Sequence, residues 1–309
     1  MSNSNYFDNK NALFLEPTVT QYGSHMVMTN VSKPTKKQYV NIDTRFRDDY
    51  DPKRPANYNI SLPERIREVK TVRVTNIELP ITFYNISANL GNNCFNITVI
   101  GEVRTVLIPD GQYDTDSLVT TVNQVISEIG VPYTNIQFLV ENNYCIFENI
   151  ESNNNYYIDF DVNNQGTFDM QNLSFKLGWI LGFREPSYVV PPLTILSALY
   201  FLDLHGPRYL YLVMDEFQNY NPQAFVSLIK TSEVNKNVLA RISMSSHDYP
   251  FGTIMPANSC SNGLLMSSYR IYTEKNDLLR MNIQLVNERG VAMDLNGMDF
   301  SFCMEFEHE

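Results

Sequence analysis

The chain ends in the run Met298-Asp-Phe-Ser-Phe-Cys-Met-Glu-Phe-Glu307, and this run decides the fold class. Five apolar residues alternate in it with acids, a serine and a cysteine: Met298, Phe300, Phe302, Met304 and Phe306. A period of two over this length predicts a strand with one buried and one solvated face. Residues 279–285 repeat the pattern, and turn signals at Gly290 and Asn296-Gly297 lie between the two runs. The chain therefore ends in two long antiparallel strands whose apolar faces need a second sheet to cover them.

Similar short runs recur along the rest of the chain. We predict strands at residues 39–43, 58–62, 69–79, 95–99, 103–108, 136–140, 144–147, 156–160, 209–214 and 238–244. Turn signals separate many of them at intervals of about ten residues. The predicted fold is mainly β: an antiparallel β-sandwich of the jelly-roll type. Residues 186–206 and 245–268 are expected to be irregular.

One segment has the period of a helix instead. An apolar stripe at i, i+4, i+7, i+8 and i+11 is formed by Leu118, Val122, Val125, Ile126 and Ile129. Asp114 or Thr115 can cap its start and Gly130 its end. We therefore predict one amphipathic helix at about 115–129. Residues 174–183, which hold the only tryptophan, are expected to form a short helical segment under the sheet.

The first 38 residues differ from the rest of the chain. They are polar, have no sustained period, and carry widely spaced aromatic residues at Tyr6, Phe7, Phe14 and Tyr22. This composition predicts a disordered segment or an extended arm that orders against a neighbour. Residues 39–309 are expected to form the jelly-roll-like domain. The pattern also allows an inserted subdomain around 110–185.

Charge limits the classes of partner. The formal net charge of −11 repels phosphate backbones, so we expect no specific nucleic acid partner. Between Lys33 and Arg73, however, eleven Lys and Arg face six Asp and Glu. This basic stretch is either a strand edge with interleaved salt bridges or a docking face for an acidic partner.

Compartment signals are sparse. Residues 1–6 lack the pattern of a signal peptide, and the most apolar run, residues 193–202, is too short to span a bilayer. The cysteines are scattered at Cys94, Cys145, Cys260 and Cys303, with no C-x-x-C pair. We expect free core thiols from a reducing compartment.

No constellation of residues predicts chemistry, so we assign no catalytic, cofactor-binding or metal-binding residue. The histidines, at 25, 205, 247 and 308, lack metal-ligand spacing, and no phosphate-binding or nucleophile motif is present. The charged cluster at residues 43–49 favours a structural turn network over a metal or phosphate site. Asp215 and Glu216 are expected to be solvated loop acids. The glycines at 178 and 182 are expected to serve packing, because apolar residues separate them.

Several blocks together resemble a known family. They are Val40-Asn-Ile-Asp-Thr-Arg-Phe-Arg-Asp-Asp-Tyr50, Asn57-Tyr-Asn-Ile-Ser-Leu-Pro63, Val72-Arg-Val-Thr-Asn-Ile-Glu-Leu-Pro-Ile-Thr-Phe-Tyr-Asn-Ile86, Ile108-Pro-Asp-Gly-Gln-Tyr113, Leu177-Gly-Trp-Ile-Leu-Gly-Phe-Arg184 and Asp294-Leu-Asn-Gly-Met-Asp-Phe-Ser-Phe302. In this order they are similar to minor capsid proteins and penton-type vertex proteins of nucleocytoplasmic large DNA viruses, phycodnavirus- or mimivirus-like. The blocks cover about half of the residues from Tyr39 onward.

The resemblance implies a non-enzymatic structural protein of an icosahedral virion, assembled in the host cytoplasm. Its implied partners are the major capsid protein and other minor capsid proteins. A vertex role would imply a homo-pentamer, and a strut beneath the capsid layer is equally open. Proximity to an internal membrane is implied without a transmembrane segment, and no cofactor is implied.

Two other classes stay open on the residues themselves. A carbohydrate- or receptor-binding β-sandwich of a virion fibre or surface protein predicts a shallow cleft lined by Tyr or Trp with nearby Asn and Asp. A glycosidase on a β scaffold predicts two facing carboxylates in a deep pocket.

Overall fold

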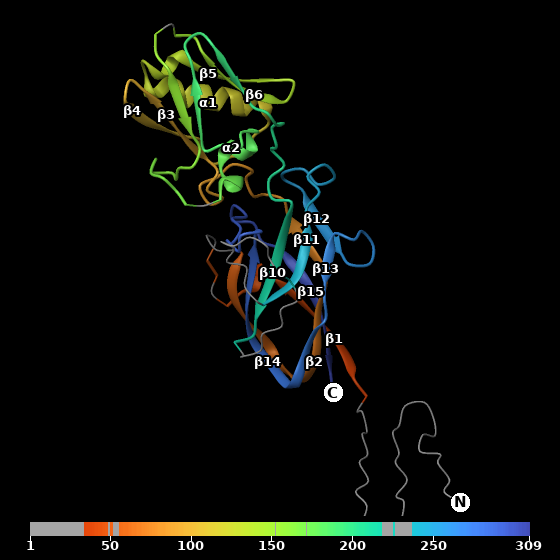
Figure 1. Cartoon of the computed structure of the whole chain (residues 1–309). Coiled ribbons are helices and arrows are strands. Elements are labelled where there is room, and N and C mark those ends of the chain that lie inside the picture. The colour runs from red at the N-terminus through yellow and green to blue at the C-terminus, as the bar shows by residue number, and fades with distance from the viewer. Residues whose placement is uncertain are drawn as a thin grey trace, which may run out of the picture.

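The computed structural model describes residues 34–48, 50–51, 56–151, 153–170, 172–217, 225 and 237–309. Within these residues the chain forms two lobes, seen one above the other in Figure 1. We name residues 34–83 and 208–309 the basal lobe and residues 84–207 the insert lobe. Each lobe has its own large buried apolar cluster. The insert lobe therefore interrupts the basal lobe in the sequence.

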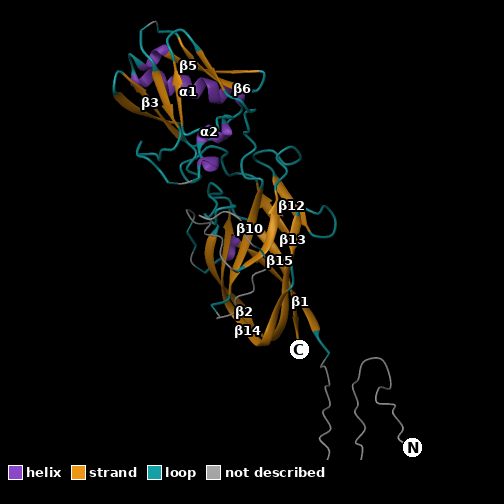
Figure 2. Cartoon of the chain, viewed as in Figure 1, coloured by secondary structure: helices purple, strands orange, loops and turns teal. Residues whose placement is uncertain are grey.

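One eight-stranded antiparallel sheet builds the basal lobe (Figure 2). Its strands are β1 (Lys36–Asp43), β2 (Asn57–Pro80), β10 (Tyr209–Asp215), β11 (Val238–Ser243), β12 (Ile254–Asn258), β13 (Leu265–Ser267), β14 (Arg270–Val286) and β15 (Ser301–His308). They follow the order β1-β15-β2-β14-β10-β11-β13, and β12 pairs with β2. A 3₁₀ turn at Thr44–Phe46 follows β1.

The sheet curls until its far edge returns to its middle. Ser267 of β13 accepts a hydrogen bond from the backbone N–H of Val74 in β2 at 2.9 Å and donates to the carbonyl of Leu239 at 3.2 Å. Curling lets one sheet provide both layers around a single core. The predicted mainly-β, antiparallel fold of the jelly-roll type is confirmed, with the two layers drawn from one continuous sheet.

Strand β2 links the two layers. Residues 58–62 and 69–79, predicted as two strands, belong to one strand of 24 residues. Its first part pairs with β14 and its second part with β15, with register shifts near Glu68, which has a φ of 54°. This irregularity changes which residues face the core, so Ile66 and Val69 are both buried.

The C-terminal strands keep most of their predicted pattern. Phe300, Phe302, Met304 and Phe306 are buried, whereas Met298 is 49% exposed because it lies in the turn before β15. In β14 the pairing shifts around Leu278, which takes the core position instead of Leu279. Both strands are antiparallel to β2, which lies between them.

Two smaller sheets and the helices form the insert lobe. The first sheet runs β4 (Glu102–Leu107), β3 (Cys94–Val99), β7 (Tyr156–Asp159), β8 (Ser187–Val190), and the second runs β5 (Ile136–Glu141), β6 (Tyr144–Asn149), β9 (Ile195–Ser197). The helices are α1 (Thr115–Ile129) and α2 (Leu177–Ile180), with 3₁₀ turns at Tyr133–Asn135 and Leu173–Phe175. Their shared core spans residues 86–204, whereas the sequence suggests an insertion at about 110–185.

Helix α1 has the bounds that its sequence predicts. The Asp114 side chain accepts from the Ser117 N–H, and the Ser117 hydroxyl accepts from the Asp114 N–H, which forms a capping box. Leu118, Val122 and Ile126 are buried against the sheets. At the other end Gly130 has a φ of 89°, a value that favours glycine.

Three segment predictions were wrong. Residues 186–206 and 245–268, expected to be irregular, contain β8 and β9 and β12 and β13, strands of only three to five residues. A period of two is hard to detect over so few positions. Residues 36–38, assigned to the N-terminal arm, belong to β1. Residues 1–33, the rest of that predicted arm, lie outside the described residues.

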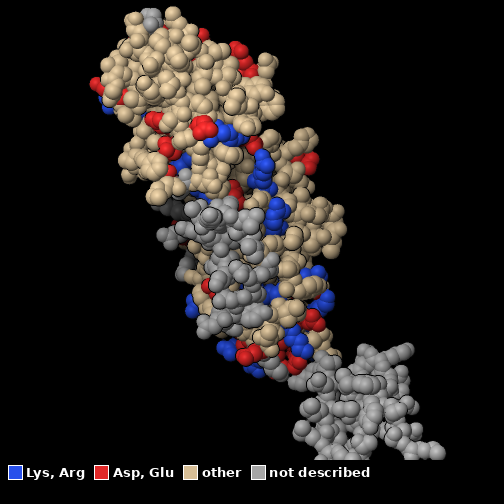
Figure 3. Space-filling view, viewed as in Figure 1, with Lys and Arg blue, Asp and Glu red and all other residues tan. Residues whose placement is uncertain are grey.

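The two lobes differ in charge. Residues 84–207 contain three Lys and Arg against thirteen Asp and Glu, so almost the whole net charge of the chain lies in the insert lobe. In Figure 3 most of the visible surface of this lobe is uncharged, and the blue side chains gather below it.

Candidate assembly surfaces and interlobe cleft

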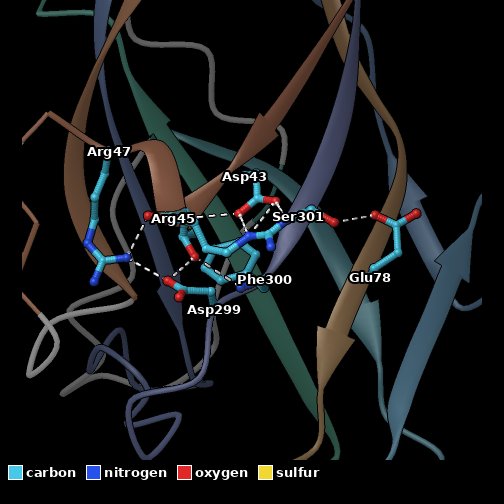
Figure 4. A network of polar contacts seen from close by, with 8 residues as sticks. Asp43, Arg45, Arg47, Glu78, Asp299, Phe300 and Ser301 are labelled. Atoms are coloured by element: carbon cyan, nitrogen blue, oxygen red, sulfur yellow. Dashed lines mark hydrogen bonds and ion pairs between the residues drawn. The ribbon is translucent and has the colours of Figure 1, made fainter.

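The charged cluster at residues 43–49 is a structural network that joins β1 to β15 (Figure 4). The Asp43 carboxylate accepts from the backbone N–H of Arg45 at 2.9 Å and from its guanidinium at 2.6 and 3.0 Å. These hydrogen bonds lower the pKa of Asp43. Thr44 and Phe300 extend the ladder, because the Thr44 N–H donates to the Phe300 carbonyl at 3.0 Å and the Phe300 N–H donates to the Thr44 hydroxyl at 3.0 Å.

Arg47 is the buried cation of this network, with a side chain only 1% exposed. Its Nη1 donates to Asp299 Oδ1 at 2.6 Å and to the Thr44 carbonyl at 2.6 Å, and its Nη2 donates to the Asp51 carbonyl at 2.9 Å. The guanidinium also lies 4.1 Å from the centre of the Tyr50 ring. Every one of these contacts positions the turn after β1, as a structural turn network requires.

A second buried acid lies further along β15. Glu305, 3% exposed, accepts hydrogen bonds from Lys37 at 2.9 Å, Arg73 at 3.0 Å and the Tyr39 hydroxyl at 3.1 Å. Burial alone would raise the pKa of Glu305, but the three donors outweigh it and hold the pKa below its usual value. The ionised carboxylate thus ties the edge strand β1 to β2 through β15.

The basic stretch is largely neutralised within the chain. Six of its eight basic side chains in the described part are ion-paired with carboxylates: Lys37, Arg45, Arg47, Arg65, Lys70 and Arg73. This pattern matches interleaved salt bridges on a strand edge. The stretch is therefore a weaker docking face for an acidic partner than its charge count suggests.

Glu216 is not the solvated loop acid that the sequence suggests. It is 9% exposed, accepts from Arg270 Nη1 at 2.6 Å, and also accepts from the Tyr272 hydroxyl. The Arg270 guanidinium donates further to the carbonyls of Met214 and Asn237. The group anchors the end of β10 to β14, and its signal in the sequence is hidden because both partners lie more than fifty residues away.

The outer face of the four-stranded sheet carries a cross-strand apolar row. Val103 is paired with Thr98, Thr98 with Tyr157, and Tyr157 with Val189. Val103, Tyr157 and Val189 are each 44–50% exposed, although cross-strand neighbours of this type stabilise a sheet most when they are covered. We name Val103, Tyr157 and Val189 the apolar row.

Strand β1 forms one edge of the basal sheet, next to β15 alone. Most of its residues are exposed, and Tyr39 is 59% exposed. An edge strand presents unpaired backbone groups that another chain can extend. This edge and the apolar row are the candidate assembly surfaces.

A cleft of about 330 Å³ lies between the two lobes. The insert lobe contributes Phe175 and Trp179, the connecting segment contributes Asp203 and Arg208, and the basal lobe contributes residues 287–289. A second cleft of about 350 Å³ shares Asn85, Gly206 and Pro207 with the first, and is lined largely by apolar side chains such as Phe83 and Phe251.

The remaining sequence candidates are scattered. Among the described residues, no three His, Cys, Asp or Glu side chains come together as a metal site. His205 and His247 are exposed and lie beside Asp203 and Asp248, and His25 lies outside the described residues. Of the four free cysteines, Cys94 and Cys145 are buried as expected, whereas Cys260 is exposed and Cys303 is half-buried.

The glycines at 178 and 182 serve close packing, as expected. A Cβ on Gly178 would lie 2.5 Å from the Phe160 ring, and one on Gly182 would overlap the Tyr200 carbonyl. None of the helices in the described part of the chain is long and apolar enough to cross a bilayer.

Comparison with known proteins gave matches among solved structures alone. No protein-family model matches the chain, and no curated protein matches it. The chain is similar to the mavirus penton protein, with a TM-score of 0.40 and 12% identity over 90% of this chain and 100% of that chain. It is also similar to a chain in the cryo-EM structure of the Sputnik virophage, with a TM-score of 0.38 and 13% identity over 89% of this chain and 98% of that one.

Proposed function

We propose that the protein is a structural, non-enzymatic component of an icosahedral virus particle, a minor capsid protein of the penton-type or capsid-stabilising kind. Its partners are the major capsid protein, other minor capsid proteins and further copies of itself, in a pentamer at a vertex. It is assembled in the host cytoplasm and resides in the capsid.

One observation carries the proposal: sequence blocks that resemble capsid proteins contact one another in the fold. The block at residues 40–50 meets the block at 294–302 through Arg47 and Asp299. The block at 72–86 meets the block at 108–113, because the Asn85 amide donates to the Tyr113 carbonyl at 2.8 Å and the Tyr113 N–H donates to the Asn85 side chain at 2.9 Å. The resemblance therefore falls on contacts that fix the fold.

The exposed surfaces support a role in assembly. The apolar row and the β1 edge offer contacts that become favourable when another subunit covers them. We assign the apolar row to contacts between copies of this chain, and the β1 edge with the preceding residues to contacts with neighbouring capsid subunits.

The test begins with the native mass of the purified chain and with cross-linking mass spectrometry on purified particles. We expect a homo-oligomer, a pentamer for a vertex protein, and cross-links to the major capsid protein. Absence of the chain from purified particles would sink the proposal.

Variants of the apolar row refine the test. Tyr157→Glu and Val189→Glu place charges on the row and should reduce self-association at least tenfold, because burying an unpaired charge costs more than the contact returns. Phe168→Glu is the matched control, since Phe168 is 70% exposed on the same lobe and lies outside the row. Equal association of all three variants would remove the row from the interface.

A further inference from the structure

The only tryptophan of the chain lines the interlobe cleft. Trp179 lies at the cleft together with Phe175 and Tyr209, and it is 39% exposed. Three aromatic side chains around one partly enclosed space are unusual for a surface that only separates two lobes. Aromatic rings of this kind offer a flat apolar face to a ligand.

The indole is held in place before any ligand arrives. The Arg184 guanidinium lies 4.1 Å from the centre of the Trp179 ring and 4.5 Å from the centre of the Tyr200 ring, so it is stacked on both. Its Nη1 also donates to the Trp179 carbonyl at 2.7 Å. A ligand that stacks on the uncovered face of the indole loses little conformational entropy of the protein on binding.

The polar lining balances charge and mixes donors with acceptors. Asp203 and Arg208 form an ion pair at 3.0 Å, and Glu288 and Arg289 line the basal side. Two acids and two guanidiniums leave the lining neutral overall, which favours a neutral ligand over an anion or a cation. Carboxylate acceptors beside guanidinium donors suit a ligand whose hydroxyls both donate and accept.

Arg289 joins the two lobes at the cleft. Its Nη2 donates to the Leu90 carbonyl in the insert lobe at 2.7 Å, and its guanidinium lies 5.1 Å from the centre of the Phe175 ring. The cleft is therefore a fixed feature of the fold. Its volume of about 330 Å³ lies at the small end of the range for ligand pockets.

We propose that the interlobe cleft is a binding site for a neutral saccharide of one or two rings, which stacks on Trp179 and is hydrogen-bonded by Asp203 and Arg208. Free saccharides and glycans on glycoproteins share this chemistry. The proposal does not depend on the assembly surfaces, because neither the apolar row nor β1 lines the cleft.

Intrinsic fluorescence tests the proposal directly, since Trp179 is the sole tryptophan reporter. The purified full-length chain is titrated with glucose, galactose, mannose, lactose and maltose. We expect saturable quenching or a blue shift of the emission with at least one of them. A neutral-glycan array then distinguishes free sugar recognition from recognition of a longer glycan.

Variants assign the binding to the cleft. Trp179→Ala should weaken binding about tenfold or more, measured by calorimetry, whereas Trp179→Phe keeps a stacking face and should restore most of it. Phe201→Ala is the control, because Phe201 is 61% exposed on the same lobe and does not line the cleft. Circular dichroism checks that each variant folds.

Two results would overturn the proposal. One is an unchanged emission spectrum with all five sugars together with a blank glycan array. The other is saccharide binding that Trp179→Ala leaves intact in a folded protein, which would place the sugar elsewhere on the chain.

Discussion

At the residue scale, the pair Arg47 and Asp299 shows how a charged motif becomes structural. Replacing Arg47 by alanine leaves Asp299 without its buried partner and removes the donors to two backbone carbonyls. Breaking such a pair should lower the free energy of unfolding by about 3 kcal/mol. The urea-unfolding midpoint of Arg47→Ala against the wild type measures the loss.

Arg45 provides the matched control for this variant. It belongs to the same cluster and also pairs with an aspartate, but its side chain is 65% exposed. Arg45→Ala should therefore cost less than about 1 kcal/mol. Equal losses for the two arginines would show that burial of Arg47 does not govern the stability of the network.

Glu305 predicts a pH dependence. Folding lowers its pKa below the ordinary value of 4.5, so the ionised carboxylate stabilises the fold above about pH 4.5, and this contribution is lost as the pH falls through the lowered value. Glu305→Gln should show a smaller fall in thermal midpoint than the wild type between pH 5 and pH 3 (roughly the range over which such a carboxylate is protonated). Parallel curves for the two proteins would contradict this role of Glu305.

The burial of these acids could not be predicted from the sequence. Glu305 occupies a position that the period of two assigns to the solvated face, and only the curl of the sheet brings Lys37 and Arg73 to it. Glu216 was misread for the same reason, since Arg270 and Tyr272 reach it from a distant strand. Turn residues 43–49 were predictable because their charges neutralise one another or a neighbour in space.

At the scale of elements, α2 depends on a glycine that packs directly on a ring. Gly178→Ala would place a methyl group 2.5 Å from the Phe160 ring, and Phe160 is fully buried. Overpacking of this kind should lower the free energy of unfolding by about 1–3 kcal/mol. Thermal unfolding followed by near-ultraviolet circular dichroism reports the change, because Trp179 is the next residue.

Gly101 separates steric crowding from backbone strain. A Cβ on Gly101 meets nothing within 4 Å, but the φ of 77° disfavours any other residue. Gly101→Ala should therefore cost about 1 kcal/mol through backbone strain alone. A loss for Gly178→Ala no larger than that for Gly101→Ala would mean that the ring moves aside.

Elements with a long period were predicted well, and short ones were not. The helix at 115–129 carries four turns of pattern and two capping signals, and its bounds agree with the structure. Strands β9 and β13 are three residues long, and their partners in β6 and β11 define them more than their own residues do. The interlobe cleft could not be predicted, because its lining comes from four separated segments.

At the scale of the whole molecule, the N-terminal residues predict a truncation experiment. Deleting residues 1–33 should leave the thermal midpoint unchanged and abolish incorporation into particles, as proposed for contacts with neighbouring subunits. Deleting residues 1–38 should also lower the midpoint, because it removes Lys37 and its ion pair with Glu305. Normal incorporation of the 34–309 protein would contradict the proposed role of the N-terminal residues.

The chain enters and leaves the insert lobe at one place. The Asn85 amide donates to the Leu204 carbonyl at 2.9 Å, and Gly206 lies against Asn85. The lobe is thus a cassette: its two connections are so close that a short glycine linker could replace everything between Phe83 and Arg208. The excised protein should still close its barrel, and a foreign module grafted at this joint would be displayed opposite the chain termini.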